Sequence, residues 1–242
     1  MFNPIFFAST NNRLQSDLVA YYKLDNSSID SKGLSNSITL SGGLSYGTGK
    51  INSGLDFNAV DKQGDIPDNG LHNLSFSNVS NDIPFSISFW VYYTGFSSSN
   101  NRLFSKRSST GGVGLSEYQI IADSGRITIA KGSSGDFLIN KTTTATITWA
   151  LNAWYHIAIT SNGNVEIIYI NGVPASAATT TTGVYTKMTI GETSLYIGDV
   201  PFLANCEHKG KIDEIAVWKN KELNQSEINR LYNSGSGLQF PF

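Results

Sequence analysis

The amino-acid sequence predicts an all-β protein, built as an antiparallel two-sheet β-sandwich with one short C-terminal helix. Residues 85–93 alternate apolar and polar side chains with the period of two that a strand with one buried face requires. Other short segments of this kind follow along the chain, separated by turn residues. Apolar residues recur at helical spacing near the C-terminus. Many short strands and a single closing helix favour a sandwich over a parallel α/β fold.

The length and composition predict a single globular domain. The chain has 242 residues, of which 40% are hydrophobic and 12% aromatic, so it can bury a substantial core. We assign residues 1–16 to an N-terminal arm, residues 17–235 to the domain and residues 236–242 to a C-terminal tail. With 17 basic and 19 acidic residues and no run of Lys or Arg, the charge pattern argues against a nucleic-acid partner.

Alternating and short apolar segments predict the strands in order along the chain. These segments are residues 18–24, 54–57, 65–67, 85–93, 103–106, 118–122, 126–130, 144–148, 154–160, 165–170 and 212–218. The glycine-rich residues 41–52 are expected to form an irregular connection, and the threonine run at 179–182 an exposed loop. Asn171-Gly172 predicts a tight turn, and Pro174, which has no backbone N–H, limits the next strand to a sheet edge.

Residues 224–235 predict the closing helix. Asn224 stands at an N-cap position, and Glu227 follows at the spacing of a capping box, in which each side chain satisfies a free backbone N–H of the other residue. The apolar stripe of this helix consists of Ile228, Leu231 and Tyr232. Gly235 is expected to end the helix, because glycine readily adopts the left-handed conformation of a helix stop.

Short motifs in a fixed order carry a family resemblance. They are Ala20-Tyr21-Tyr22-Lys23-Leu24-Asp25, Gly54-Leu55-Asp56-Phe57, Phe85 to Val91, Leu103 to Lys106, Trp154-Tyr155-His156-Ile157-Ala158, Tyr169-Ile170-Asn171-Gly172, Leu195-Tyr196-Ile197-Gly198 and Gly210 to Trp218. In this order the chain resembles a laminin-G-like (LamG) domain of the concanavalin A-like lectin/glucanase superfamily. The resemblance implies a jelly-roll topology, which periodicity alone does not show, and it does not specify a ligand.

Trp90 and Tyr92 point away from the apolar face of their predicted strand. In one interpretation they pack under a loop or beside a neighbouring strand. In the other they form an aromatic platform for a sugar ring, because the apolar C–H face of a pyranose stacks on an aromatic ring. We therefore assign Trp90 and Tyr92 as the candidate glycan-binding residues.

Asp213 is the carboxylate that most needs a partner. If Ile215 and Val217 face the core, alternation places Asp213 on the same side, where an unpaired charge costs several kcal/mol. The resemblance implies a calcium ion at a sandwich rim, with Asp30 matching an aspartate loop of the family, and we assign Asp30 and Asp213 as its ligands. Alternatively, Asp213 caps backbone N–H groups or pairs with Lys209 or Lys211.

A second rim is a further option for calcium. Asp61, Asp65 and Asp199 fall in two loops, at residues 61–70 and 192–199, that could approach each other. In the simpler interpretation these aspartates are only solvated.

The motifs of an enzyme are missing from the sequence. No Glu-x-Asp-x-x-Glu pattern occurs, and Asp213 and Glu214 are adjacent, so on a regular strand they would face opposite sides and not form a hydrolytic pair. His156 matches a position where the family often holds a histidine, which implies a structural role. Cys206 is the single cysteine and is either a buried apolar group or a reactive thiol.

Both ends of the chain carry apolar and aromatic residues, which are Phe2, Ile5, Phe6 and Phe7 at the start and Phe240 and Phe242 at the end. Chain ends fray unless something holds them, so these residues predict docking on the domain itself or on a neighbouring subunit. We assign them as assembly contacts. The apolar patch at residues 5–8 has no basic residue before it and is too short for a secretory signal or a membrane span.

These features lead to two functional hypotheses. The first is a non-catalytic, lectin-like structural or decoration protein on the surface of a phage virion, partnered by other virion subunits or by its own copies and binding cell-surface glycans. The alternative is a carbohydrate-binding lectin module of a bacterial cell surface or secreted system. Neither hypothesis involves nucleic acid or membrane insertion.

Overall fold

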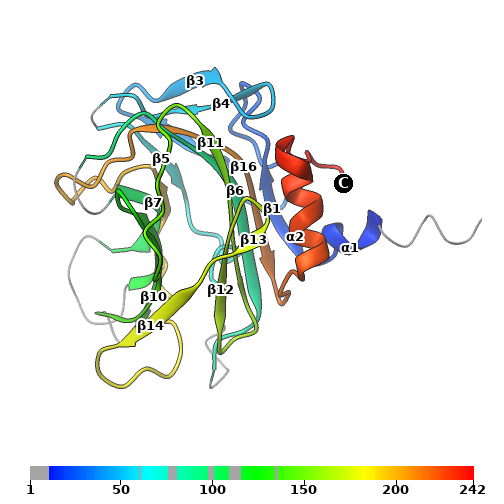
Figure 1. The fold of residues 1–242 in the computed structure, drawn as a ribbon. Helices are drawn as coiled ribbons and strands as arrows, with labels where there is room; N and C mark the ends of the chain where they lie inside the picture. Colours follow the sequence, from blue (N-terminus) through cyan, green and yellow to red (C-terminus); the bar gives the residue numbers. More distant parts are fainter. Residues whose placement is uncertain (1–10, 60, 76–80, 98–100, 109–115, 134–135) are drawn as a thin grey trace, which may run out of the picture.

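In a computed structural model, two antiparallel β-sheets face each other, and helix α2 (Gln225–Tyr232) lies on the outside of one of them (Figure 1). The structure describes residues 11–59, 61–75, 81–97, 101–108, 116–133 and 136–242. We call the sheet that carries α2 sheet A and the other one sheet B. The predicted all-β sandwich with a short C-terminal helix is confirmed. No helix of the described ranges is long and apolar enough to cross a membrane.

Sheet A follows the order β13 (Val173–Pro174), β12 (Glu166–Ile170), β11 (Trp154–Ser161), β6 (Phe85–Tyr93), β16 (Gly210–Lys219), β4 (Ser53–Asp56) and β3 (Ser45–Thr48), and β1 (Leu18–Tyr22) also pairs with β16. The edge position of β13 is the one that Pro174 predicts. Sheet B follows the order β14 (Ala177–Thr181), β10 (Asp136–Thr143), β9 (Ile127–Ser133), β8 (Ser116–Ala122), β7 (Asn101–Arg107), β15 (Leu195–Ile197), β5 (Gln63–Ile66) and β2 (Thr39–Ser41).

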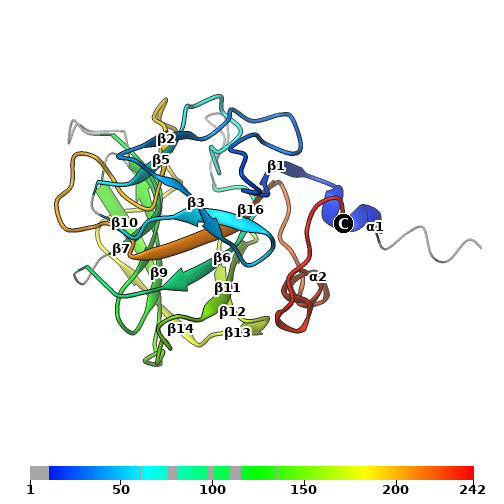
Figure 2. The same cartoon turned by 90° about the horizontal axis from the view of Figure 1, so that it is seen from above.

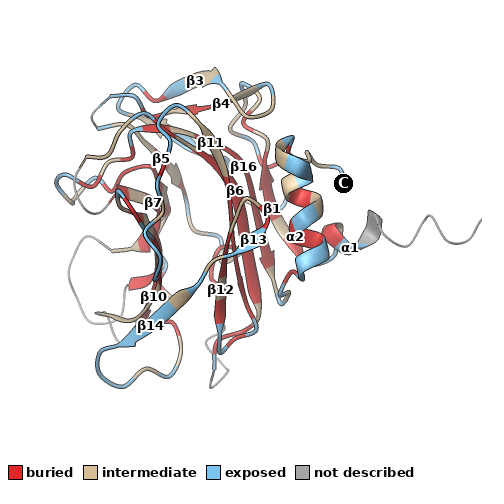
Figure 3. Cartoon of the chain, viewed as in Figure 1, coloured by how far each residue is buried: buried red, intermediate tan, exposed pale blue. Residues whose placement is uncertain are grey.

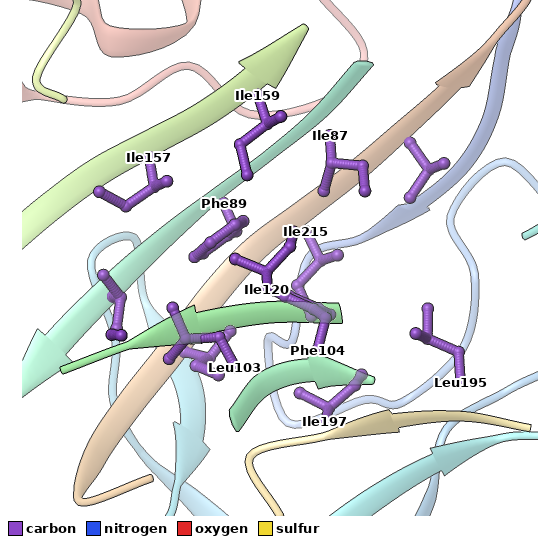
Figure 4. Close-up of a cluster of buried hydrophobic side chains, with 14 of the residues drawn as sticks. Ile87, Phe89, Leu103, Phe104, Ile120, Ile157, Ile159, Leu195, Ile197 and Ile215 are labelled. Atoms are coloured by element: carbon purple, nitrogen blue, oxygen red, sulfur yellow. The ribbon is translucent and has the colours of Figure 1, made fainter. Parts of the chain in front are cut away.

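The main core lies between the two sheets (Figure 4). Alternate residues of β6 supply one wall of it, and Phe89 meets Phe104 of sheet B with ring centroids 4.7 Å apart. The other wall comes from the inward residues of β7, β8 and β15, including Leu103, Ile120 and Ile197. This packing is the physical reason for the period of two in residues 85–93.

Helix α2 lies over the outer face of sheet A (Figures 2 and 3), and a second core lies beneath it. Trp218 of β16 is fully buried there, and its indole N–H donates to the carbonyl of Leu14 at 2.7 Å. Ile228 and Leu231 of α2 pack on the same face, next to the short helix α1 (Asn11–Gln15). Sheet A is therefore buried on both sides over much of its area.

The capping box of α2 is confirmed. The Asn224 side chain accepts a hydrogen bond from the Glu227 N–H at 3.1 Å, and the Glu227 carboxylate accepts one from the Asn224 N–H at 3.0 Å. The end of the helix differs from the prediction. Asn233, with φ 46°, is the left-handed C-cap, and the 3-10 turn η2 (Asn233–Gly235) follows it.

The C-terminal tail packs on the chain's own domain. The rings of Phe240 and Phe242 lie 5.5 Å and 5.4 Å from the ring of Tyr21, and Phe242 also stacks on Trp218 at 6.3 Å. This is the first of the two arrangements that the aromatic ends suggested. The other predicted assembly contacts, Phe2, Ile5, Phe6 and Phe7, lie outside the described residues.

Several predicted loops and strands need correction. Residues 41–52 contain strand β3, and the first three residues of the threonine run belong to β14, where pairing with β10 orders an exposed segment. Residues 144–148 do not form a strand, and the preceding residues form β10 instead. Strand β14 lies at the edge of its sheet, where a strand needs few apolar side chains.

A β-bulge in β16 overturns the predicted alternation of that strand. The pairing of β16 with β6 shifts between Asp213 and Ala216, and Glu214 adopts a left-handed φ of 51°. Ile212 and Ile215 therefore both face the main core, with two residues between them instead of one. Asp213 does not share the inward face with Ile215, and alternation no longer separates Asp213 from Glu214.

Candidate functional site

One row of residues crosses the outer face of sheet A beyond the reach of α2. Trp154 of β11 pairs with Tyr92 of β6, which pairs with Lys211 of β16, which pairs with Asp56 of β4. Residues directly opposite each other in a sheet share a face. The adjacent row, which includes Val91, points into the main core, so these four side chains point outward. We call Trp154, Tyr92, Lys211 and Asp56 the open row.

The open row combines an aromatic pair with two charged groups. The rings of Tyr92 and Trp154 lie 5.3 Å apart at 54°, and the Lys211 ammonium lies 5.7 Å from the centre of the Tyr92 ring. All four residues are partly exposed. A Cβ at Gly47 would lie 2.9 Å from Asp56 Oδ2, so glycine leaves room for this carboxylate. The row thus presents apolar rings beside a hydrogen-bond donor and an acceptor.

The next outward row has the opposite surroundings. His156, Trp90 and Asp213 are paired across β11, β6 and β16 in the same way, and all three are buried. We call them the covered row. Trp90 is 3% exposed, and its ring lies 5.9 Å from the Tyr232 ring of α2 and 4.4 Å from the Lys50 ammonium. Trp90 therefore has no open ring face, whereas Tyr92 does reach the surface.

The carboxylate of Asp213 binds backbone N–H groups of the loop that contains Lys50 and Ile51. Its Oδ2 accepts hydrogen bonds from the N–H groups of Lys50 at 2.8 Å and Ile51 at 3.0 Å, and its Oδ1 accepts one from the Glu214 N–H at 2.9 Å. Gly49 makes this approach possible, because a Cβ there would lie 2.6 Å from Oδ2. Burial raises the pKa of Asp213 to about 8, and these N–H groups counteract the shift. Backbone capping is the role that the sequence left open beside calcium binding.

Glu214 joins the first strand to the C-terminal tail. Its carboxylate accepts hydrogen bonds from the Tyr21 hydroxyl and from Gln239 Nε2, the latter at 2.6 Å. Burial raises the pKa of Glu214 to about 7. The pocket beside it, lined by Trp90, Leu231 and other residues, has a volume of about 10 Å³, enough for about one water molecule. Asp213 and Glu214 are neighbours on the outer face, yet no sugar can reach them.

The carboxylate of Asp30 also accepts hydrogen bonds from backbone N–H groups. It is 3% exposed, and its two oxygens accept backbone hydrogen bonds from Tyr21, Lys32, Leu34 and Ser35 at 2.8–3.0 Å. Calcium needs six to eight oxygen ligands that are free to face the ion. Asp30 and Asp213 instead face N–H donors from two different loops. These two residues do not fit a shared calcium site, and no group of three potential metal-binding side chains occurs within the described ranges.

The second predicted rim is partly assembled. Asp61 and Asp199 line one pocket of about 320 Å³ together with Gln63 of β5, and Asp65 is not part of its lining. Burial raises the pKa of Asp199, and the nearby Asp61 adds to the effect. Asp199 Oδ1 accepts hydrogen bonds from the Val200 N–H at 2.7 Å and from the Cys206 thiol at 3.3 Å. One of the two carboxylates is therefore already engaged within the protein.

Neither His156 nor Cys206 is placed for catalysis. His156 is 1% exposed, its Nε2 lies 2.8 Å from the Ser88 hydroxyl, and burial lowers its pKa to about 3. The thiol of Cys206 is buried, and burial raises its pKa to about 11, which disfavours the thiolate that a nucleophile needs.

Sequence patterns located only one member of the open row. Tyr92 was assigned from alternation, while Trp154 and Lys211 come from strands that lie far away in the sequence. Their position beside Tyr92 depends on strand register, which the sequence does not specify. The signal that could have found Trp154 is its place at the start of a predicted strand whose later residues are apolar.

Several solved structures share this fold. Domain 4 of AbnA, a GH43 extracellular arabinanase from Geobacillus stearothermophilus solved in complex with arabinotriose, matches with a TM-score of 0.65 and 21% identity, over 92% of this chain and 98% of that one. The binding domain of Paraclostridial mosquitocidal protein 1 matches with a TM-score of 0.69 and 18% identity, over 92% and 53%. A structure of botulinum neurotoxin type C, whose cell entry depends on two ganglioside molecules, matches with a TM-score of 0.64 and 16% identity, over 94% and 52%.

The chain spans nearly all of the arabinanase domain but about half of each toxin chain. At these identities the likeness shows the fold alone. No curated protein gives a sequence match. The sequence pattern of the family Laminin_G_3, described as the concanavalin A-like lectin/glucanases superfamily, matches residues 60–229, which confirms the resemblance seen in the motifs. The chain therefore belongs to the concanavalin A-like lectin/glucanase superfamily.

Proposed function

We propose that this protein is a non-catalytic carbohydrate-binding module and that the open row is its binding surface. The observation that carries the proposal is the row itself, in which Trp154 and Tyr92 expose adjoining rings beside Lys211 and Asp56. Sugar C–H groups carry a slight positive charge and are attracted to the negative face of an aromatic ring. The ammonium and the carboxylate can then donate to and accept from the sugar hydroxyls.

Two further observations support binding without catalysis. The adjacent carboxylates Asp213 and Glu214 are buried beneath the loop and tail that they hold, and the cavity beside Glu214 is too small for a sugar. The similar arabinanase domain was solved with arabinotriose, and the similar neurotoxin depends on gangliosides. By analogy, we infer that this module acts on glycans displayed outside a cell.

The first hypothesis, a role on a phage virion, drew part of its support from the aromatic ends of the chain. Phe240 and Phe242 pack on the chain's own sheet A, so this tail needs no second subunit to bury its rings. Because this tail is engaged within the chain itself, we propose the carbohydrate-binding module in place of the virion role.

A glycan array followed by affinity electrophoresis tests the proposal. The array should carry arabinan oligosaccharides, ganglioside headgroups and bacterial cell-wall glycans. We expect the wild type to bind at least one class, and Tyr92→Ala and Trp154→Ala each to weaken that binding by about tenfold, as loss of a central aromatic contact does.

The matched control is Tyr196→Ala. Tyr196 is also a partly exposed tyrosine, but it lies on sheet B, beside Phe202 at 5.7 Å. We expect this variant to bind like the wild type. Binding that survives in both open-row variants, or no binding to any glycan of the array, would contradict the proposal.

A further inference from the structure

A polar pocket lies at the opposite end of the sandwich from the open row. Strand β11 begins at Trp154, which belongs to the open row, and ends at Ser161, whose hydroxyl donates to Glu166 Oε1 at 3.3 Å. Glu166 begins β12 and lines a pocket of about 260 Å³. Since β11 is extended at about 3.3 Å per residue, more than 20 Å separates the two places. The pocket is therefore independent of the open row.

A buried group of charges forms the floor of this pocket. Lys131 of β9 is 3% exposed, and its ammonium lies 2.8 Å from Asp82 Oδ2 and 2.7 Å from Glu166 Oε1. Asp82 also accepts hydrogen bonds from the Tyr185 hydroxyl at 2.5 Å and from the Met188 N–H at 2.7 Å. Lys131 thus joins sheet B to sheet A through Glu166, and both Asp82 oxygens are occupied.

Glu166 and Lys131 keep unused hydrogen-bonding capacity. Glu166 is 3% exposed, and both of its contacts, to Lys131 and Ser161, use Oε1. Oε2 accepts no hydrogen bond from any residue that the structure describes. An ammonium group has three N–H donors, and the two carboxylates account for two of them. A free acceptor therefore lies beside the ammonium of Lys131, which also lies 4.9 Å from the centre of the Tyr185 ring.

The walls of the pocket are uncharged. Neutral polar side chains come from Asn81, Asn164, Thr179 and Thr186. The ring of Tyr185 and the aliphatic Ile139 complete the lining with apolar surface. Neutral hydroxyl and amide groups combined with one aromatic and one aliphatic side chain suit a ligand that is polar around its edge and apolar on its faces.

The charge arrangement selects among ligand classes. The two carboxylates outnumber the single ammonium, which disfavours an anion, while the ammonium itself disfavours a metal ion or an amine at the same spot. A hydroxyl group can both donate and accept. Pockets for drug-sized ligands start at about 300 Å³, so this smaller one suits a single ring.

We propose that this pocket binds one neutral sugar unit, with one hydroxyl donating to Glu166 Oε2 and the neighbouring hydroxyl accepting from Lys131. The inference goes beyond the open row and does not depend on it, because the pocket has its own chemistry at the other end of the sandwich. Its ligand would be a free monosaccharide or the end unit of a glycan chain.

Three variants test the pocket. Thr179→Tyr should fill its mouth without touching the buried charges, because Thr179 is exposed on β14. Thr180→Tyr is the matched control, since neighbouring residues of a strand point to opposite sides. Glu166→Gln keeps the size of the side chain and removes the carboxylate that accepts the hydroxyl. Thermal unfolding of each variant establishes that the protein is folded.

Saturation-transfer NMR on the full chain, with L-arabinose, D-galactose and D-glucose as probes at millimolar concentration, provides the readout. We expect at least one of these sugars to give a signal that falls about tenfold in Thr179→Tyr and in Glu166→Gln. The signal should persist in Thr180→Tyr and in the open-row variant Tyr92→Ala. Equal signals in Thr179→Tyr and Thr180→Tyr, or no signal with any of the three sugars, would overturn the proposal.

Discussion

Two neighbouring rows on the outer face of sheet A contain similar residues in opposite surroundings. The covered row places Trp90 between Tyr232 and Lys50, so its ring helps to hold α2 on the sheet. The open row places Tyr92 and Trp154 on the same face, one row further from the helix, with their rings partly exposed. An aromatic side chain on an outward strand position can therefore serve either stability or binding. What decides is whether another element covers it.

The polar residues of the two rows differ in the same way. In the covered row, Asp213 accepts three backbone N–H groups and His156 meets a serine hydroxyl. In the open row, Lys211 keeps its ammonium near the Tyr92 ring and donates to the Thr48 carbonyl at 3.1 Å, in an exposed position. Covered polar groups must find partners within the protein, while exposed ones remain available to a ligand.

Trp90→Ala is the variant with the largest expected effect. Removing a buried tryptophan side chain costs about 3–5 kcal/mol of unfolding free energy, because it leaves a cavity under α2. Tyr92→Ala, on the open row, should cost about 1 kcal/mol or less, as partly exposed positions usually do. Urea denaturation of both variants measures the difference, and equal losses would remove the distinction between the two rows.

Glu214→Gln tests the burial of Glu214 on the covered part of sheet A through the pH dependence of the unfolding free energy. Burial raises the folded-state pKa of Glu214 from its usual 4.5 to about 7, so the folded protein holds a proton that the unfolded chain releases. The stability contributed by this proton is present below about pH 4.5 and is lost as the pH rises to about 7, by up to about 3 kcal/mol. The unfolding free energy of the wild type minus that of Glu214→Gln should fall over this window. A difference that stays constant with pH would show that Glu214 is ionised in the fold.

Phe242→Ala tests how firmly the tail covers sheet A. Phe242 is 8% exposed and packs on Tyr21 and Trp218. Burial of such a ring contributes about 2 kcal/mol, and the variant should lose about that much in chemical denaturation. An unchanged midpoint would mean that the tail adds nothing to the second core, and would reopen the idea that its rings serve another chain.

Asn224→Ala should have a smaller effect on stability than Phe242→Ala. Loss of the N-cap that starts α2 costs about 1 kcal/mol. Asn229→Ala is the control, because Asn229 is an exposed position inside the same helix where alanine is at least as favourable. Thermal unfolding distinguishes the two. A loss in Asn229→Ala as large as that in Asn224→Ala would contradict the capping role.

Local patterns in the sequence predicted the parts of the fold that local physics controls. The period of two in residues 85–93 gave strand β6, and Asn224 with Glu227 gave the start of α2. The bulge at Glu214 could not be predicted from local patterns. It brings two carboxylates into contact with β1, the tail and the loop that includes Lys50, which are all distant in the sequence. The polar strand β14 was missed because its pairing with β10, and not its composition, orders it.

The same distinction holds for the candidate sites: local patterns predicted some of their features, and the arrangement of the folded chain determines the others. Alternation identified Trp90 and Tyr92 as outward residues, and this is correct for both. Coverage by α2, which buries only Trp90, depends on how the helix docks. Asp213 was recognised as a carboxylate that needs a partner, and its partners are backbone N–H groups of a loop distant in the sequence. Asp30 was assigned from the family resemblance, and its partners include backbone N–H groups of the loop that follows it. Register and docking, which bring such residues together, are properties of the folded chain.

The most direct test of the central claim follows the indole N–H signals of the four tryptophans by NMR while a bound glycan is titrated in. The open row predicts that the Trp154 signal shifts most, while those of the buried Trp90 and Trp218 stay close to their positions in the free protein. A glycan that binds and leaves Trp154 unmoved, or that shifts Trp90 at least as much, would contradict the account.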